Sequence, residues 1–507
     1  MKNRKSILHL TSEVSPFYKR GGLGDVVGSL PQYLSKEYRN CVISFYYNGR
    51  MKGLEEAQKY QFSMPVHGVE YGFYYYKLVR DGVHYFFIDM EDENVLADSE
   101  GGSGGSQKGK GSTAYVEVLP MSTHFYFAKA ALRLIELEDV QPLHILLHDW
   151  HVCGIFGYEK MLDNLRRRYD SKTTIMIHNF EYKGALLPDS FPFMDPDCRP
   201  VLEALYQKHR SASLLGLGIE KADHVATVSK GYARELEQGL APHIGYKFLE
   251  ARPDGVLDFT NGVDYSLWHP QNSPFLPTPY NWESIERKKQ YKKDMIEQFG
   301  FDDTDEPICL FMARLTPQKG ISLLMNFAAS DEEGLAQIEK ALDSGLRLVV
   351  YGTPSNGEND RMHHLFSLAR KHFPKRFYYD GKYTEVKAHR YLAGADMLLS
   401  PSYFEPCGLV QLYAMAFGTV PLVNPVGGLG HTVDCYRKEP ENATGFHLRS
   451  YTSESLNECM RLAGQIYNEQ ADRWQELVQE GMERDFSWEK MTQKYLTFFE
   501  ADMVIQV

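Results

Sequence analysis

The chain of 507 residues lacks several features that would place it in a common class of protein. Its seven cysteines are odd in number and form no C-x-x-C pair, which argues against a disulfide framework and favours a reducing compartment. No apolar run approaches the roughly 18 residues of a membrane span, and residues 1–14 carry no cleavage signature. The net charge of −12 disfavours nucleic acid or an anionic membrane as partner. We therefore expect a cytoplasmic protein with neither partner.

Nucleotide-binding signatures of the common kinds are also missing. The glycines near the start of the chain lack the spacing of a dinucleotide fingerprint and the GK[ST] ending of a P-loop. No internal repeat of short, fixed period is present. The composition, with 43% hydrophobic and 24% charged residues, is that of an ordinary globular protein. At this length one core does not suffice, so the chain should contain two large domains.

Short apolar runs alternate with amphipathic stretches throughout the chain. Runs of this kind, bounded by turn residues, indicate strands of parallel sheets that are buried on both faces. The two series predict an α/β fold of two doubly wound, Rossmann-like domains. The expected strands are residues 7–11, 41–47, 144–148, 173–178 and 224–229 in the first half, and 308–313, 347–352, 377–380, 397–400 and 420–424 in the second.

The proline-rich segment 269–282 interrupts both series, so we place the join between the domains there. This gives an N-terminal domain of residues 1–270 and a C-terminal domain of residues 283–485. Residues 486–507 contain a stretch with helical apolar spacing that we expect to pack back on the first domain. The Gly/Ser-rich segment 99–112 should be a mobile loop, because the apolar pattern resumes at residues 114–119.

The segment PSYFEPCGL, residues 401–409, is the most informative in the chain. It follows an expected strand and precedes a helix-like run, which puts Glu405 at the carboxyl end of a strand. Ligands of open α/β sheets bind outside such strand ends, and free amides at a helix start favour phosphate. A carboxylate for hydroxyl groups beside amides for phosphate fits a sugar nucleotide. A solvated glutamate in an ordinary loop is the simpler alternative.

Two cations follow the first expected strand of the second half. Arg314 and Lys319 lie five residues apart across a turn, so both can reach one diphosphate, the arginine as a bidentate fork and the lysine as a point charge. Such a pair stabilises charge that develops on a leaving group. Solvated loop cations are the alternative.

Three segments of the first half should share one edge of their sheet. Residues 18–26 bring Lys19 and a run of glycines after the first strand, and HDWH (148–151) and HNFEYKG (178–184) follow two others. Asp149 and His178 are suited to hydrogen bonds with hydroxyl groups. The spacing of the two histidines in HDWH permits a metal, but no third ligand of fixed spacing accompanies them, so we expect no metal site.

These segments, in this order, closely resemble the bacterial and plant glycogen/starch synthase family of glycosyltransferases. The family pattern SE-x-x-P-x-x-KTGGLGDV matches residues 12–26, and PS-x-FEPCGL-x-QLYAM-x-x-GT-x-P matches residues 401–421. The motifs HDWH, HN-x-x-YQG, NGVD-x-x-x-W, R-x-x-x-QKG and GGL-x-DTV match residues 148–151, 178–184, 261–268, 314–320 and 427–433. The likeness covers nearly the whole chain.

The resemblance implies the GT-B fold, in which two Rossmann-like domains face each other across a deep cleft. It implies transfer of glucose from a nucleotide sugar, usually ADP-glucose, to the non-reducing end of an α-1,4-glucan, with retention and without metal or cofactor. It also implies a set of site residues. The expected catalytic residues are Arg314, Lys319, Glu405, His178 and Asp149. The expected substrate-binding residues are Lys19, Gly21, Gly22, Asn179, Tyr383, Cys407, Gly408 and Leu409.

The chain departs from the family pattern around these residues. Arg20 replaces the threonine of KTGG, Lys183 the glutamine of YQG, Tyr403 an arginine and His431 the aspartate of DTV. The changes flank the nucleotide and the acceptor, so the sequence leaves the donor base open between ADP and UDP. A transferase with a small acceptor, or a glucan-binding homologue without catalysis, are the alternatives. The sequence predicts neither oligomeric state nor regulation.

Overall fold

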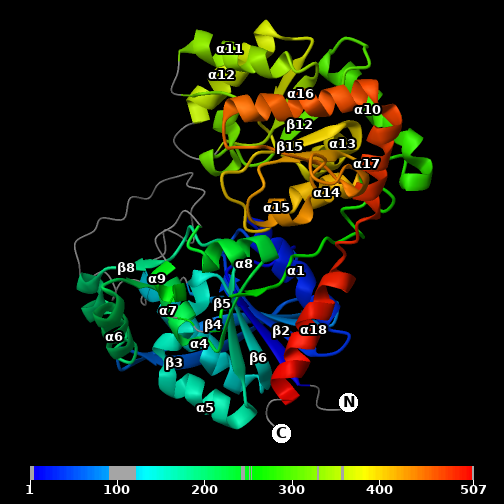
Figure 1. Ribbon diagram of the computed structural model, residues 1–507. Helices are drawn as coiled ribbons and strands as arrows, with labels where there is room; N and C mark the ends of the chain where they lie inside the picture. The colour runs from blue at the N-terminus through cyan, green and yellow to red at the C-terminus, as the bar shows by residue number, and fades with distance from the viewer. Residues whose placement is uncertain are drawn as a thin grey trace. The chain divides into compact units, whose positions relative to one another are not determined.

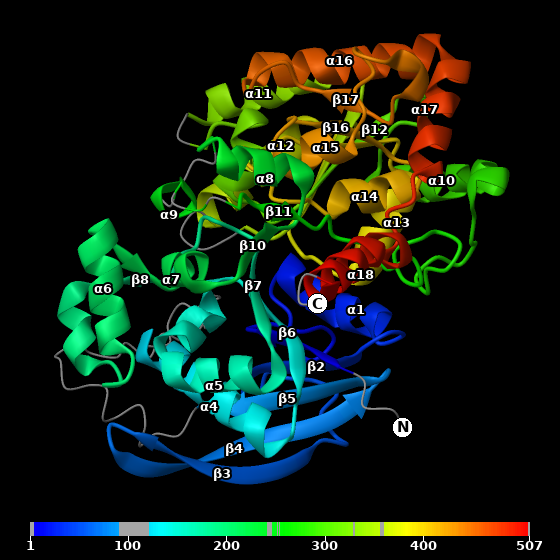
Figure 2. The ribbon, with the colours of Figure 1, turned by 60° about the horizontal axis from the view of Figure 1, so that its bottom comes forward.

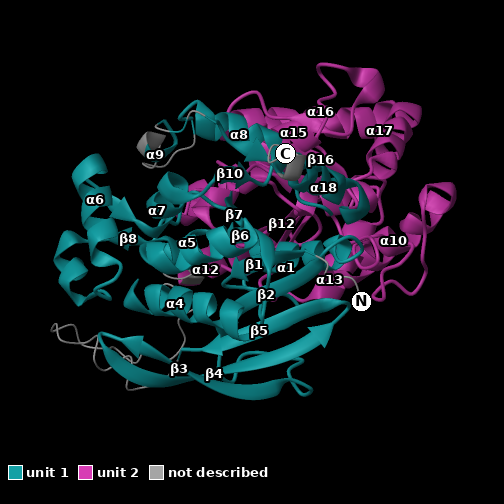
Figure 3. Ribbon diagram, turned by 90° about the horizontal axis from the view of Figure 1, so that it is seen from below, with its two compact units in different colours: residues 1–262, 488–507 teal, residues 263–487 magenta. Residues whose placement is uncertain are grey.

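The computed structural model describes residues 5–90, 121–240, 246–250, 252, 254–327, 330–354 and 359–504. The Gly/Ser-rich segment 99–112 and the apolar run 114–119 lie outside these ranges. The chain forms two compact units, one of residues 1–262 and 488–507 and the other of residues 263–487, coloured separately in Figure 3. Within the described ranges, no helix has the length and apolar character needed to cross a membrane.

The boundary between the units does not lie in the proline-rich segment 269–282, where we placed it from the sequence. Unit 2 begins at Val263, and the segment 269–282 belongs to it. Trp268 stacks on Tyr413 with ring centroids 4.0 Å apart, and the hydroxyl of the buried Tyr280 donates to Phe417 O at 2.9 Å. The prolines keep this segment out of helices and strands, but its aromatic residues bury themselves in unit 2. The compact units therefore differ from the expected limits of 1–270 and 283–485: unit 1 ends at residue 262 before the chain returns to it, and unit 2 covers residues 263–487.

Unit 1 is built on a nine-stranded sheet, which is parallel except at one end. The strand order is β11-β10-β7-β6-β1-β2-β5-β4-β3, and β4 alone runs antiparallel to the other strands. β8 (Ala185–Leu186) and β9 (Ala212–Ser213) form a separate two-stranded ribbon. The main sheet consists of β1 (Ser6–Thr11), β2 (Arg39–Tyr46), β3 (Gln58–Val66), β4 (Val69–Arg80), β5 (Val83–Asp89), β6 (Pro142–His148), β7 (Lys172–Ile177), β10 (His224–Thr227) and β11 (Leu257–Asp258).

Helices cover both faces of this sheet (Figure 1). On one face, apolar side chains of β1, β6 and β7 pack with the first and the last helix of the chain, α1 and α18. On the other face they pack with α4, α7 and the 3-10 segment η1. The helical segments are α1 (Gly22–Leu34), α4 (Met121–Leu137), η1 (Trp150–Gly157), α5 (Glu159–Tyr169), η2 (Pro188–Phe193), α6 (Arg199–His209), α7 (Leu214–Lys221), α8 (Lys230–Glu237), α9 (Tyr246–Glu250) and α18 (Trp488–Val504).

The C-terminal helix α18 packs on unit 1, the domain to which the chain returns at Trp488. Its side chains Trp488, Tyr495 and Phe499 are buried with Val26 and Leu30 of α1. Gly262 makes this approach possible, since a Cβ atom there would lie 2.5 Å from the Trp488 ring.

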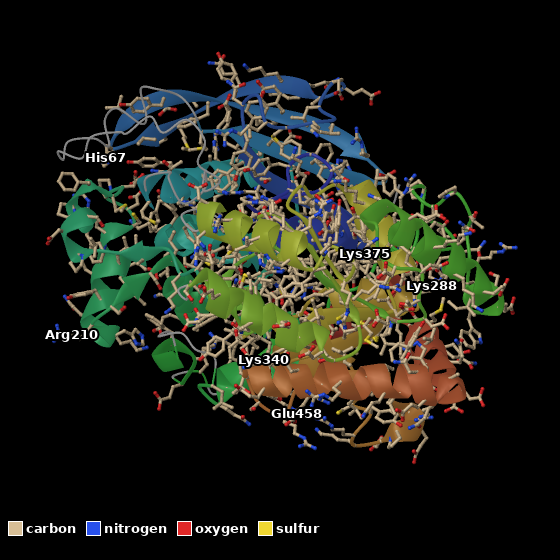
Figure 4. The ribbon with its side chains drawn as sticks, turned by 90° about the horizontal axis from the view of Figure 1, so that it is seen from above. His67, Arg210, Lys288, Lys340, Lys375 and Glu458 are labelled. Carbon is tan, nitrogen blue, oxygen red and sulfur yellow. The ribbon has the colours of Figure 1, made fainter. Side chains whose placement is uncertain are left out.

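Strands β3, β4 and β5, side by side in Figure 2, were absent from the strands expected from the sequence. Two tight turns join them, His67-Gly68 and Asp81-Gly82, and all four residues have positive φ. This is the backbone of type I′ turns, whose twist matches that of the paired strands. His67, labelled in Figure 4, marks the first turn, and its ring nitrogen Nε2 lies 2.7 Å from the hydroxyl of Tyr126.

Unit 2 has a six-stranded sheet that is parallel throughout. Its strand order is β14-β13-β12-β15-β16-β17, which is the 3-2-1-4-5-6 order of a Rossmann fold. The four-residue or longer strands all lie where the sequence predicted them. They are β12 (Ile308–Met312), β13 (Arg347–Tyr351), β14 (Phe377–Asp380), β15 (Met397–Ser400) and β16 (Val420–Val423), followed by the short β17 (Phe446–His447).

Both faces of the second sheet are also covered. One face packs with α10, α13 and α14, and the other with α11, α12, α16 and α17. Side-chain caps start several of these helices; Thr384 accepts from Lys387 N at α13, for example. The helical segments are η3 (Trp282–Arg287), α10 (Lys288–Phe299), η4 (Pro317–Lys319), η5 (Ile321–Leu323), α11 (Asp331–Leu342), α12 (Asn359–His372), α13 (Glu385–Gly394), α14 (Val410–Ala416), α15 (Gly427–Thr432), η6 (Pro440–Asn442), α16 (Ser453–Glu469) and α17 (Ala471–Glu483).

Each sheet has one point at which the order of its parallel strands reverses. In unit 1 it falls between β1 and β6, and in unit 2 between β12 and β15. Loops leave the two adjacent strands in opposite directions there, so a crevice opens at the carboxyl ends of the strands. The residues selected from the sequence follow these strands and their neighbours.

Candidate active site

In unit 2, the loops after β12 and β15 are joined at the reversal point. Tyr403 N donates to Gln318 O at 2.8 Å, and Gln318 Nε2 donates to Phe404 O at 3.4 Å. Gly320 has a φ of 74°, and a Cβ atom there would lie 2.1 Å from Pro401 O. Only glycine fits this position, because any side chain would push the loops apart. The loop with the two cations is thus fixed against the loop with the carboxylate.

Lys319 and Glu405 form an ion pair across these two loops. The Nζ–Oε2 distance is 2.5 Å, and Ser402 Oγ donates to the same oxygen at 3.0 Å. The glutamate side chain is buried and the lysine is partly exposed. A glutamate held in this way keeps Oε1 for a ligand, while the lysine shields its charge. The proximity of Lys319 to a carboxylate rather than to Arg314 was not predicted from the sequence.

Arg314 is exposed, and within the described ranges its guanidinium makes no hydrogen bond or ion pair. Its backbone oxygen accepts from Thr316 N at 2.9 Å, which starts the turn that leads to Lys319. All five donors of the side chain are therefore available to an anion. That both cations hold one diphosphate stays a prediction.

A third loop closes around the segment that follows Glu405. Gly428 N, in α15, donates to Glu405 O at 2.9 Å, and a Cβ atom on Gly428 would lie 2.0 Å from Cys407 O. Gly408 has a φ of 71°. In the part of the chain that the structure describes, the N–H groups of Gly408 and Leu409 donate to no protein atom. Free amides ahead of α14 are suited to phosphate oxygens.

Tyr383 lies on the loop after β14, at the same edge of the sheet. Its side chain is 52% exposed, and its ring lies 5.5 Å from that of Tyr351. One strand, β13, separates β14 from β12, and β14 is the edge strand of the sheet, so Tyr383 belongs to the outer part of this edge. The assignment to base stacking stays a prediction.

In unit 1, the glycine loop after β1 is already occupied by a carboxylate of the protein. Glu13 Oε2 accepts from Arg20 N at 2.6 Å and from Gly21 N at 3.0 Å. Lys19 pairs with Asp25 at 2.5 Å. Burial raises the pKa of Glu13, although the two amide bonds and Arg20 oppose this. Of the groups expected to meet the donor, the N–H of Gly21 already donates to Glu13, whereas the N–H of Gly22 donates to no acceptor in the described part of the chain.

Asp149 connects the loops that follow β6 and β7. Its Oδ1 accepts from His178 N at 2.7 Å and from Asn179 N at 3.2 Å. Its φ of 62° and ψ of −178° lie in a region that is almost reserved for glycine. Burial raises the pKa of Asp149 to about 7, against the effect of the two amide bonds. Asp149 therefore builds the loop with Oδ1, and Oδ2 is left for a hydroxyl group.

The imidazole of His178 is bonded to a second histidine. The distance from His178 Nε2 to His148 Nδ1 is 2.9 Å, and His148 Nε2 lies 3.1 Å from His9 Nδ1. His151 instead stacks on Trp150 with ring centroids 4.0 Å apart. The two histidines of HDWH thus contact different side chains. In the described ranges, no group of three or more side chains is arranged to hold a metal ion. His9 was missed in the sequence because it lies inside a strand.

Comparisons with known proteins agree with this assignment of the two units. Residues 6–247 match the family model of the starch synthase catalytic domain, and residues 292–478 match that of glycosyl transferases group 1. A glycogen synthase of Vibrio cholerae is 32% identical over 507 residues, covering 96% of this chain and 97% of the relative. A glycogen synthase of Mycoplasma mobile is 29% identical, covering 97% and 98%.

Solved structures share the fold. The catalytic domain of starch synthase IV from Arabidopsis thaliana superposes with a TM-score of 0.82, at 23% identity over 98% of this chain and 99% of that one. Sucrose-phosphate synthase from Thermosynechococcus elongatus reaches 0.59 at 15% identity over 99% of this chain and 100% of that one.

Two Rossmann-like units with ligand-suited loops at their reversal points define a glycosyltransferase of the GT-B class. The chain belongs to the glycogen synthase family. That its units face each other across a cleft stays a prediction.

Proposed function

We propose that this protein transfers glucose from ADP-glucose to the non-reducing 4-hydroxyl of an α-1,4-glucan, with retention of configuration. The observation that carries the proposal is the Arg314–Lys319–Glu405 cluster at the reversal point of unit 2, in a chain of this family. The cluster combines cations for a diphosphate with a carboxylate for sugar hydroxyl groups. The Arabidopsis neighbour binds ADP and acarbose, which favours an adenine donor.

The diphosphate would be held by unit 2. Arg314 offers an unpaired guanidinium, Lys319 an ammonium, and Gly408 and Leu409 their free amides. Negative charge grows on the diphosphate as the bond to the anomeric carbon breaks, and these donors stabilise it most at that moment. Glu405 accepts hydrogen bonds from the glucose hydroxyl groups, and Cys407 lies in the same segment. We propose that no metal or cofactor takes part.

The glucose and the acceptor would be met by unit 1. His178 and Asn179 lie against the sugar, Asp149 near the acceptor, and Lys19 and Gly22 approach the donor from the loop after β1. Since Glu13 binds the Gly21 amide, this loop offers the phosphates fewer amides than the resemblance implies. Closure of the two units over both substrates would exclude water and bring the acceptor hydroxyl to the face that the diphosphate leaves.

Release of nucleoside diphosphate tests the proposal. We expect release from ADP-glucose with glycogen present, little release without it, and less from UDP-glucose under either condition. Activity in excess EDTA should be unchanged. A higher rate with UDP-glucose would assign a different donor. Glycogen binding without release from either donor would identify a glucan-binding homologue instead.

A further inference from the structure

A row of hydrogen bonds crosses four neighbouring strands of unit 1. It begins at His178, just after β7, continues through His148 at the end of β6 and His9 inside β1, and ends at Asn40 in β2. The four strands are consecutive in the sheet, so each contributes one member of the row. His9, His148 and Asn40 are fully buried, and His178, with 9% of its surface exposed, is the outermost member.

The direction of the row is set at its inner end. Asn40 Nδ2 donates to Tyr38 O at 3.2 Å, which turns Oδ1 toward His9 Nε2, 3.1 Å away. An amide oxygen only accepts, so the hydrogen of this bond must be on His9 Nε2. A neutral imidazole carries one hydrogen, and His9 Nδ1 is therefore an acceptor.

Because each neutral imidazole has one donor nitrogen and one acceptor nitrogen, the assignment for His9 determines those of His148 and His178. His148 must carry its hydrogen on Nε2 to donate to His9 Nδ1, which makes His148 Nδ1 an acceptor. His178 must then carry its hydrogen on Nε2 to donate to His148 Nδ1. Within the described ranges, His178 Nδ1 has no hydrogen-bond partner. The outermost atom of the row, His178 Nδ1, therefore presents a lone pair that can accept a hydrogen bond.

Burial keeps all three rings neutral. It lowers the pKa of His9 to about 4 and of His178 to about 3, and it lowers that of His148 far below the usual range. An extra proton is then not expected at neutral pH, and the hydrogen bonds of the row select one of the two neutral tautomers of each ring.

We infer that Asn40, His9 and His148 are positioning residues that hold His178 with its hydrogen on Nε2, so that Nδ1 accepts a hydrogen bond from a hydroxyl group of the bound sugar. The substrate class in this inference rests on the proposed function. The arrangement gives His178 no proton to donate through Nδ1, so it orients the sugar and does not act as a general acid. A hydroxyl that donates to Nδ1 is fixed in direction, which orients the ring that carries it.

The tautomer can be observed directly in the unmodified protein. Long-range ¹H–¹⁵N spectra of protein labelled in its imidazoles distinguish protonated from unprotonated ring nitrogens, and the His178 signals are assigned by their loss in His178→Gln. We expect a neutral ring with hydrogen on Nε2 from pH 6 to 8. A hydrogen on Nδ1 would overturn the inference. The spectra need no substrate, so this result stands even if no donor releases nucleotide, which would refute the proposed function alone.

The variant Asn40→Asp should reverse the row. A carboxylate beside His9 favours the doubly protonated ring. His9 would then donate to His148, His148 to His178, and the hydrogen of His178 would move to Nδ1. We expect reversed His178 signals and a fall of about tenfold in kcat/KM for the sugar nucleotide, the loss of one hydrogen bond to a neutral group. A purely structural role for Asn40 would lower stability without reversing the signals.

Asn164→Asp is the matched control, since Asn164 lies exposed on α5, away from the row. It makes the same chemical change and should alter neither spectrum nor kinetics. Reversed His178 signals with unchanged kcat/KM in Asn40→Asp would show that the tautomer does not serve catalysis, and would overturn the inference.

Discussion

The two units have a similar order of parallel strands, but they differ in whether the polar groups on their loops are hydrogen-bonded to one another. Both sheets reverse their order beside the first strand of the unit, and both place the selected residues on the loops there. In unit 1 these residues bond to one another: Glu13 holds the glycine loop, Asp149 the loop after β7, and the histidines form a buried row. In unit 2, Arg314 and the amides of Gly408 and Leu409 are left without partners in the described ranges.

The difference shows how one topology supplies two kinds of surface. A loop whose polar groups are mutually satisfied is rigid and nearly neutral, and it suits the recognition of a sugar by a few fixed hydrogen bonds. A loop with free donors is ready for a multiply charged anion. The sheet order determines only where the loops lie; the polar side chains on them determine what they bind.

The largest effect should come from the two cations at the reversal point of unit 2. Arg314→Ala and Lys319→Ala should each lower kcat by a factor of about 10² to 10³, or roughly 3 to 4 kcal/mol in the barrier, as for a lost oxyanion donor. Steady-state release of nucleoside diphosphate measures this. The control is Lys340→Ala, a change on the exposed side of α11, marked in Figure 4. Near-normal turnover in both site variants would contradict the assignment of the diphosphate to the cations of unit 2.

Unit 2 also contains a buried lysine whose amino group has several hydrogen-bond partners. Lys288, labelled in Figure 4, donates from Nζ to the carbonyl oxygens of Leu392, Ala393 and Phe417 and approaches Thr419 Oγ1 at 2.8 Å. Lys288→Met should lower the free energy of unfolding by about 3 kcal/mol, because several buried acceptors lose their donor. Urea unfolding measures this, with the exposed neighbour as control in Lys289→Met. Equal stability of the two variants would contradict the role assigned to Lys288.

Acid should destabilise unit 1 before unit 2. Burial lowers the pKa of six histidines of unit 1, whereas in unit 2 it does so for His389, to about 4, and His269. A lowered pKa means that the unfolded chain binds the proton more tightly, so stability is complete above pH 6.5 and falls as the pH drops toward 4. His9 alone should contribute about 3 kcal/mol, while the raised pKa of Asp149 opposes the trend.

Hydrogen exchange followed by mass spectrometry, at pH 7 and pH 5, resolves the two units. Protection should decrease first in β1, β6 and β7. A simultaneous loss in β12 and β15 would show that the buried histidines do not set the acid stability of unit 1.

The smallest effect should separate two glycines that look alike in the sequence. Gly320→Ala should lower stability by about 2 kcal/mol and weaken donor binding, because its φ is positive and Pro401 O leaves no room for a Cβ atom. Gly21→Ala should change stability by less than about 1 kcal/mol, since its backbone is extended and no atom lies within 4 Å of the new carbon. Thermal unfolding and donor titration measure both. A reversed order would contradict the loop geometry.

The sequence predicted the buried parallel strands well and the antiparallel ones poorly. All ten expected strands exist, because a strand buried on both faces is a short apolar run whatever its partners are. The hairpins of β3, β4 and β5 were missed, although Asp81-Gly82 between two apolar runs is a strong hairpin signal. The family motifs identified the loops that carry the site.

What the sequence could not give is which polar groups bond to each other. Glu13 Oε2, for example, accepts from the amides of Arg20 and Gly21, which lie 7 and 8 residues further along the chain. The histidine row joins residues that are 30 to 139 positions apart. Such contacts depend on strand order and register, which no local pattern encodes.

The return of the chain to unit 1 has a consequence for its synthesis. Trp488, Tyr495 and Phe499 complete the packing of α1 and of the sheet face beneath it, yet the ribosome adds them only after all of unit 2. Unit 2, an uninterrupted stretch, is whole before them. The first half of the polypeptide therefore keeps an open apolar face until residues 488–499 have been added, and a stop codon before Trp488 would harm the domain that was made first.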